Sequence, residues 1–209
     1  MGTPVPDVDG RSRLLAAAYE LFAERGVEAV SVRLLAERAQ VTAGLVTHHF
    51  GSKDGLIEQV DAYALGLCSE ILAGAMAAAG ERPDGDARPI AGVQDAITDA
   101  LSDQPVLRGY IGRRLVSDSA AGQQFFGQFA QLVEAGLRQL RSAGAVRDSI
   151  DHMGATVLVV HLILGPIVLA RQWSQLAGID AFDPRLVAPV AAATSAVLEG
   201  GLFEPEPAR

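Results

Sequence analysis

The chain has 209 residues and a formal net charge of −8 at pH 7, and 49% of its residues are hydrophobic. This acidic balance excludes a protein that coats nucleic acid through many Lys and Arg contacts to phosphate, so any nucleic-acid site must be a local patch. The single cysteine excludes an intrachain disulfide and a cysteine-based zinc cluster, which is typical of a cytoplasmic protein.

The first predicted element is a helix over residues 11–25. Residues 1–10 lack a basic region followed by an apolar one, so they are expected to be a flexible lead-in and not a signal peptide. Four apolar residues then recur on one helical face and predict the first helix: Leu14, Ala18, Leu21 and Phe22. Gly26 is expected to end it.

Two short helices are predicted next. Ser31 is a good N-cap for a helix that runs to about residue 39. After a tight turn at Gln40 and Val41, Thr42 is expected to cap a helix over 43–49, and Ser52 a long helix over 53–78. Two short helices joined by a turn, with the first helix behind them, make a helix-turn-helix domain over residues 11–52.

Residues 79–89 break the helical pattern with two prolines and two glycines, and they predict a loop. Further helices are expected over 90–101, 105–117, 122–142, 149–176 and 184–200, and no useful run of strand-like alternation occurs. The fold class is therefore all-α with about nine helices. Residues 53–203 would form a connecting helix and a larger C-terminal helical domain, and residues 204–209 a flexible tail.

The segment SVRLLAERAQVTAGLVTHHFGSKDGL, residues 31–56, resembles the DNA-binding segment of the TetR family. That family's pattern runs T/S-x-x-x-I/L-A-x-x-A-G-V-S-x-G-x-L/I-Y-x-H-F-x-S-K-x-x-L. The agreement includes Gly44, His49, Phe50, Ser52, Lys53 and Leu56, and the resemblance covers roughly residues 11–58. It implies a transcriptional regulator whose second short helix enters the major groove.

The resemblance also implies which residues meet DNA. Arg33 would reach DNA from the preceding helix, and Lys53 would hold a phosphate. The full predicted set is Arg33, Thr42, Ala43, Gly44, Thr47, His48, His49 and Lys53. His49 has an equally good interpretation as a packed histidine. Lys53 has an alternative interpretation as a solvated helix-start residue, but a cation at a helix start opposes the helix dipole, which favours a contact with an external anion. Neither His48 nor His49 has the spacing of a zinc ligand, because consecutive helical residues point about 100° apart.

Two positions depart from the family pattern. Gln40 stands where the family often has Gly, which predicts a slightly different turn. Thr47 stands where the family often has Tyr, so the backbone contact of that Tyr would be weaker here or would pass to His48. The operator sequence therefore does not follow from the resemblance.

The C-terminal part is expected to pair and to bind an effector. One recognition helix buries too little surface for useful specificity, so a homodimer through helices 149–176 and 184–200 and a palindromic operator are predicted. A small apolar or amphipathic effector would occupy a pocket in the helical core. Candidate lining residues are Tyr63, Leu67, Tyr110, Phe125, Phe129, His161 and Trp173, each of which also has an interpretation as plain core.

The sequence thus predicts a dimeric repressor released from its operator by an effector, with no metal and no cofactor. A helix-turn-helix activator and an effector-independent DNA-binding protein stay open as alternatives. A membrane-associated regulator would rest on the apolar run 153–170, for which a helix buried on all sides is preferred. The sequence contains no G-x-S-x-G, G-x-G-x-x-G, P-loop or H-E-x-x-H motif, so an enzyme is not expected.

Overall fold

The computed structural model describes residues 8–80, 89–144, 146 and 149–201. Within these ranges it has ten helices and no β-strand. The helices are α1 Val8–Arg25, α2 Val32–Ala39, α3 Gly44–Phe50, α4 Lys53–Gly80, α5 Pro89–Ser102, α6 Pro105–Leu115, α7 Ala120–Ser142, α8 His152–Val168, α9 Ala170–Ala177 and α10 Pro184–Gly201. The all-α prediction is confirmed, with one helix more than expected.

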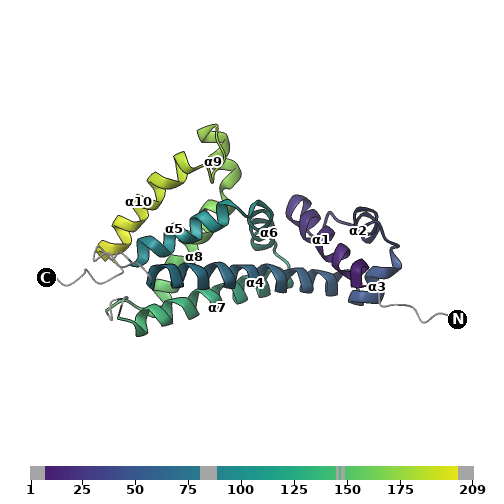
Figure 1. Ribbon diagram of the computed structural model, residues 1–209, viewed down its shortest axis with the longest axis horizontal. Helices are drawn as coiled ribbons and strands as arrows, with labels where there is room; N and C mark the ends of the chain where they lie inside the picture. Colours follow the sequence, from purple (N-terminus) through teal and green to yellow (C-terminus); the bar gives the residue numbers. More distant parts are fainter. Residues whose placement is uncertain (1–7, 81–88, 145, 147–148, 202–209) are drawn as a thin grey trace.

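Helices α1, α2 and α3 form a small N-terminal unit at one end of an elongated molecule (Figure 1). Leu14, Ala18, Leu21 and Phe22 of α1 are fully buried, as their spacing predicts. The helix begins at Val8, three residues earlier than predicted, and Gly26 ends it in a left-handed conformation with φ +80°. The predicted tail 204–209 lies outside the described residues.

Serine residues begin two helices as predicted, but a threonine does not begin a third. The Ser31 hydroxyl accepts from Leu34 N at 3.2 Å and the Ser52 hydroxyl from Gly55 N at 3.0 Å. The prediction that Thr42 caps α3 is wrong, because Ala43 is the N-cap residue and no side chain caps the helix. The backbone closes this turn instead, with Leu45 N donating to the Thr42 carbonyl at 3.1 Å.

Helix α4 connects the two parts of the molecule (Figure 1). Its 28 residues pack against α1 and α3 at one end and against α5 and α7 toward the other. It ends at Gly80, so residues 79 and 80, which were predicted to be loop, are helical. The rest of that loop, residues 81–88, lies outside the described ranges.

The prediction of a single helix over residues 149–176 is wrong. The chain forms α8 and α9, whose axes differ by 57°, and Leu169 lies at the break with φ −95° and ψ 8°. Pro166 lies inside the last turn of α8 and has no N–H to donate to the carbonyl one turn earlier, which weakens the helix just before the bend. Helix α9 therefore projects away from α8 (Figure 1).

The apolar run 153–170 is not buried on all sides, contrary to the prediction. The side chain of Met153 is 68% exposed, and Val157 and Leu158 are also exposed. By length and composition alone, α4 could cross a membrane over Lys53–Ala77, and α8 with α9 passes the same test only as one bent span. The core helix of a soluble protein passes this test equally well.

Candidate functional site

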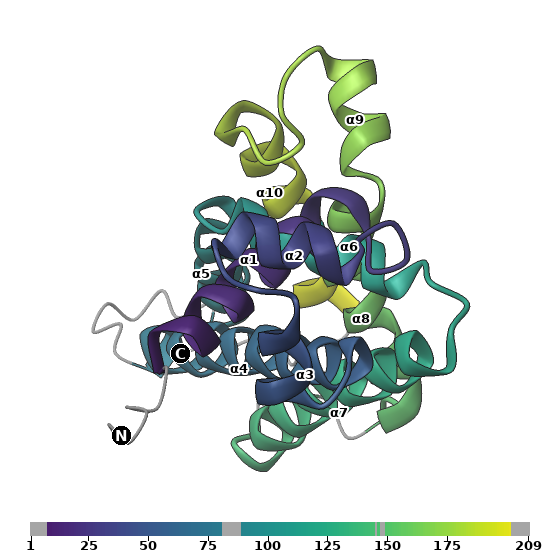
Figure 2. The same cartoon turned by 90° about the vertical axis from the view of Figure 1, so that its right-hand side faces the viewer.

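The N-terminal end of α3 forms an exposed surface. Val46 is 1% exposed and anchors α3 in the core of the N-terminal unit. The residues predicted to lie along a DNA groove are all exposed: Thr42, Ala43, Gly44, Thr47 and His48, together with Arg33 on α2. Figure 2, viewed from this end, shows α1, α2 and α3 together on the side that faces the viewer. A second molecule can therefore reach the whole surface without any movement of the chain.

The turn between α2 and α3 has a left-handed residue at Gln40, with φ 55°. No other non-glycine residue has a positive φ in the part of the chain that the structure describes. Val41 N donates to the Ala36 carbonyl at 2.9 Å, and Arg13 Nη1 donates to the Ala39 and Gln40 carbonyls, both at 3.3 Å. Gln40 thus adopts the conformation that is usual for a glycine at this position of a helix end.

Lys53 is half-buried at the start of α4. Its Nζ donates to the Val27 carbonyl at 2.5 Å, which joins α4 to the connection between α1 and α2. An ammonium group has three donors, so the predicted phosphate contact would use those that remain. This bond was not predictable from the sequence, since the acceptor is a backbone atom 26 residues away.

His49 and Phe50 are half-buried. Nε2 of His49 is buried and has no hydrogen-bond partner among the described residues, and its ring lies edge-on to that of His48 at 4.9 Å. A phosphate contact by His49 would therefore have to use Nδ1. The guanidinium of Arg11 lies 5.3 Å from the centre of the Phe50 ring.

Helix α3 and helix α4 are in direct backbone contact. A Cβ atom added at Gly55 would lie 2.1 Å from the Phe50 carbonyl oxygen, a distance that no side chain tolerates. Gly55 therefore allows the first turn of α4 to lie against the end of α3. The end of α3 is thus held against the start of α4 by a close backbone contact.

Helix α6 joins the N-terminal unit to the C-terminal bundle. Arg113 Nε donates to the Ala23 carbonyl of α1 at 2.8 Å. Arg114 donates to the Asp61 carboxylate of α4 from Nε at 2.8 Å and from Nη2 at 2.7 Å, and the Tyr110 hydroxyl donates to the same carboxylate at 2.6 Å. The bond to Asp61 raises the pKa of Arg114 while burial opposes this, and burial followed by the bond to Asp61 raises the pKa of Tyr110.

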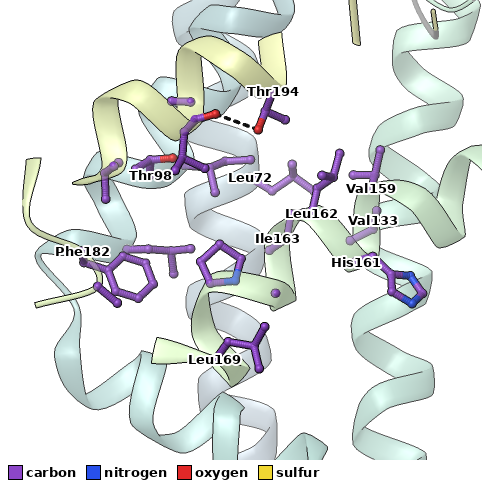
Figure 3. Close-up of a pocket in the computed structure, with 18 of the residues that line it drawn as sticks. Leu72, Thr98, Val133, Val159, His161, Leu162, Ile163, Leu169, Phe182 and Thr194 are labelled. Atoms are coloured by element: carbon purple, nitrogen blue, oxygen red, sulfur yellow. Dashed lines mark hydrogen bonds between the residues drawn. The ribbon is translucent and has the colours of Figure 1, made fainter. Parts of the chain in front are cut away.

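A cavity of about 430 Å³ lies among six helices of the C-terminal part, α4, α5, α7, α8, α9 and α10 (Figure 3). Of the predicted ligand-binding residues, His161 and Trp173 line it. Phe129 lines a smaller cavity of about 40 Å³. The sequence did not predict the other lining residues, such as Leu72, Thr98 and Phe182, because the cavity forms where the faces of several helices diverge.

Four of the predicted ligand-binding residues lie outside both cavities: Tyr63, Leu67, Tyr110 and Phe125. Tyr110 and Phe125 are buried, with their rings edge-on at 6.0 Å. Tyr63 packs edge-on against Tyr19 at 5.2 Å. Tyr110 and Phe125 therefore fit the plain-core interpretation, whereas Tyr63 is 46% exposed and fits neither the pocket nor the core.

Known proteins resemble this chain in two ways. Residues 14–60 match the family model described as bacterial regulatory proteins, tetR family. The N-terminal segment of the chain therefore carries a domain of the TetR family. The segment is similar to that of the HTH-type transcriptional repressor Rv3405c of Mycobacterium tuberculosis, with 53% identity over 47 residues. That match covers 22% of this chain and 25% of the relative, so the chain spans about a quarter of that protein's length.

Solved structures of other regulators share the fold over nearly the whole chain. A TetR transcriptional regulator from Chloroflexus aurantiacus has a TM-score of 0.69 at 17% identity, covering 93% of this chain and 96% of its own. The fatty acid degradation regulator FadR from Bacillus halodurans has a TM-score of 0.66 at 15% identity, covering 88% and 97%. At such identities the likeness is one of fold, and it extends the TetR-like architecture to the C-terminal helices.

Proposed function

We propose that the protein is a cytoplasmic, dimeric, sequence-specific DNA-binding regulator whose operator binding is controlled by a small effector. The observation that carries the proposal is the exposed N-terminal end of α3, anchored by buried Val46, within a segment that matches the TetR family. Helices placed in this way read base edges in the major groove. Repression is the favoured direction of control, because the relative Rv3405c is named a repressor.

An apolar face on two C-terminal helices supports the homodimer. Exposed large hydrophobic residues gather on α8 and recur on α10: Met153, Val157, Leu158, Leu162, Val190 and Val197. Large exposed apolar patches are rare on monomeric soluble proteins, and the gathering of these residues on two helices favours a subunit contact. The pairing of α8 and α10 with their symmetry mates would place two α3 helices on one DNA duplex.

Direct contacts support control of DNA binding by an effector. The cavity is lined by α4 and α8, α8 packs on α6, and α6 is bonded to α1 and α4. A change in the cavity therefore has a contiguous route to α3 through Gly55. If the effector weakens operator binding, the operator weakens effector binding by the same factor.

Selection of bound duplexes from a random pool with the purified dimer tests the proposal. We expect a palindrome whose half-sites lie about one helical turn apart, with an affinity that falls steeply with salt. The operator is then used to measure the dissociation constant with and without added small molecules. Recovery of no enriched sequence would contradict the proposed function.

A further inference from the structure

We propose that the cavity takes an uncharged, apolar small molecule and excludes organic anions, including the carboxylates of free fatty acids. This inference rests on the proposed function, since it names the chemical class of the effector. The first observation is size: about 430 Å³ lies within the range of ligand sites in proteins. The cavity also reaches the surface at Leu169 and Trp173, which are each 44% exposed, so a ligand can enter.

The second observation is the chemistry of the walls. Among the described residues that line the cavity, no Asp, Glu, Lys or Arg occurs. The polar lining side chains are Thr98, Thr194 and His161, the indole of Trp173 adds one neutral N–H donor, and the rest are apolar. A carboxylate moved from water into such a cavity would lose its hydration without meeting a cation, whereas a neutral molecule would lose little.

The three polar side chains do not supply a cation at the centre of the cavity. The Thr194 hydroxyl donates to the Val190 carbonyl at 2.8 Å within its own helix. Nδ1 of His161 lies 2.7 Å from the Val157 carbonyl. Phe182 lies on the opposite side of the cavity, and the His161 ring points away from it (Figure 3). A carbonyl can only accept, so Nδ1 carries the proton of that bond. The Thr98 hydroxyl has no hydrogen-bond partner among the described residues and can bond one neutral polar group of a ligand.

The matched probes are methyl decanoate and decanoate, which differ in the charge of one end. Trp173 is the only tryptophan in the chain and lines the cavity, so its fluorescence reports occupancy. In titrations of the full-length protein at pH 7.5, below the concentrations at which the probes aggregate, we expect methyl decanoate to bind at least about 100-fold more tightly than decanoate. Equal binding, or tighter binding of decanoate, would overturn the proposal.

Two pairs of variants assign the signal to the cavity. Gly136 lines the cavity on α7, and a Cβ there would meet only the flexible end of Leu72 at 3.2 Å. Gly136→Leu should reduce methyl decanoate binding at least about tenfold by filling the space. Gly127→Leu on the same helix, where a Cβ meets nothing within 4 Å and which does not line the cavity, should leave it unchanged.

The second pair adds a charge. Thr98→Lys places an ammonium group in the cavity and should shift the preference toward decanoate at least about tenfold, whereas Thr98→Met, of similar length, should not. Unchanged selectivity in Thr98→Lys would contradict the electrostatic reason for the preference.

The outcomes separate this inference from the proposed function. If the protein selects an operator but neither probe changes Trp173 fluorescence, the ligand class is wrong and the DNA-binding proposal stands. If the probes bind as expected but no operator is recovered, the ligand class stands and the regulator proposal fails. Loss of probe binding on dimer formation would mean that a partner subunit fills the space, and it would overturn the inference.

Discussion

Arg114 and Asp61 form a two-point ion pair between α6 and α4, with Nε to Oδ1 at 2.8 Å and Nη2 to Oδ2 at 2.7 Å. Arg114 is 2% exposed, so the Asp61 carboxylate is needed to compensate its buried positive charge. Arg114→Met should lower the free energy of unfolding by about 3–5 kcal/mol, because it leaves a largely buried carboxylate without its cation. Urea unfolding followed by circular dichroism measures the change.

The double variant Asp61→Leu with Arg114→Met is the control for that experiment. It removes both charges, and its loss of stability should be much smaller than the sum of the single losses. Tyr110→Phe removes one hydrogen bond to a charged group and should cost about 1.5–3 kcal/mol. Additive losses in the double variant would mean that the ion pair itself contributes little.

Gly55→Ala should destabilise the junction of α3 and α4. The added Cβ would lie 2.1 Å from the Phe50 carbonyl oxygen, so the backbone has to shift, at a cost of about 1–3 kcal/mol. Gly66→Ala in the same helix adds a Cβ that meets nothing within 4 Å and should instead stabilise the protein by about 1 kcal/mol. Thermal unfolding of both variants makes the comparison, and a similar shift in the two would contradict the close contact.

His48→Asp should abolish operator binding while leaving the fold intact. His48 is exposed on α3, so an added carboxylate would meet DNA phosphates and not the protein core. We expect the dissociation constant to rise at least about 100-fold in a fluorescence anisotropy titration. Gln128→Asp, which adds the same charge at an exposed position of α7, should change it little. Comparable losses for both variants would count against α3 as the DNA-contacting helix.

Leu158→Glu should disrupt the proposed dimer. Leu158 is 44% exposed on α8, and a charge buried there in a subunit contact would raise the dimer dissociation constant by about 30-fold or more. Phe126→Glu is the matched control, since Phe126 is 45% exposed but lies on α7. Sedimentation velocity over a concentration series measures both. A dimer unaffected by Leu158→Glu would remove α8 from the interface.

The Cys68 thiol should react slowly in the folded protein. Burial raises the pKa of Cys68 from 9.0 to about 12, so at pH 8 the thiolate fraction falls about a thousandfold. Iodoacetamide should therefore modify the native protein far more slowly than the urea-unfolded chain, and the native rate should keep rising with pH well above 9. Because the folded pKa is the higher one, the stability linked to this thiol is full below pH 9 and declines as pH rises toward 12. Equal native and unfolded rates at pH 8 would show that the thiol is not protected.

Local signals in the sequence predicted the helix boundaries of the N-terminal unit well. Gly26, Ser31 and Ser52 act on backbone groups within a few residues, and each is found in the predicted role. Thr42 was predicted wrongly by the same reasoning, because the backbone alone closes the turn before α3. A capping residue shows where a helix can begin, and packing decides whether its side chain is used.

Long-range contacts could not be predicted in this way. The bond from Lys53 to the Val27 carbonyl and the ion pair of Asp61 with Arg114 join segments 26 and 53 residues apart. The bend at Leu169 lies three residues after Pro166. The proline in the sequence indicates a weakened helix, but it does not predict the direction in which the chain continues. The cavity depends on how six helices diverge, and periodicity along one helix carries no information about that.

Because α4 is long and contacts α3 at Gly55, a small tilt of α4 about its C-terminal end would displace α3 by a much larger distance. Its 28 residues extend over about 42 Å, so a tilt of about 5° around its C-terminal end displaces its first turn by about 4 Å. In a symmetric pair the two displacements would add, and the distance between the two α3 helices would change by a sizeable part of one DNA turn. A rearrangement within the bundle as small as the reorientation of one side chain would then change the separation of the two α3 helices. At the new separation they would no longer match successive major grooves of the DNA.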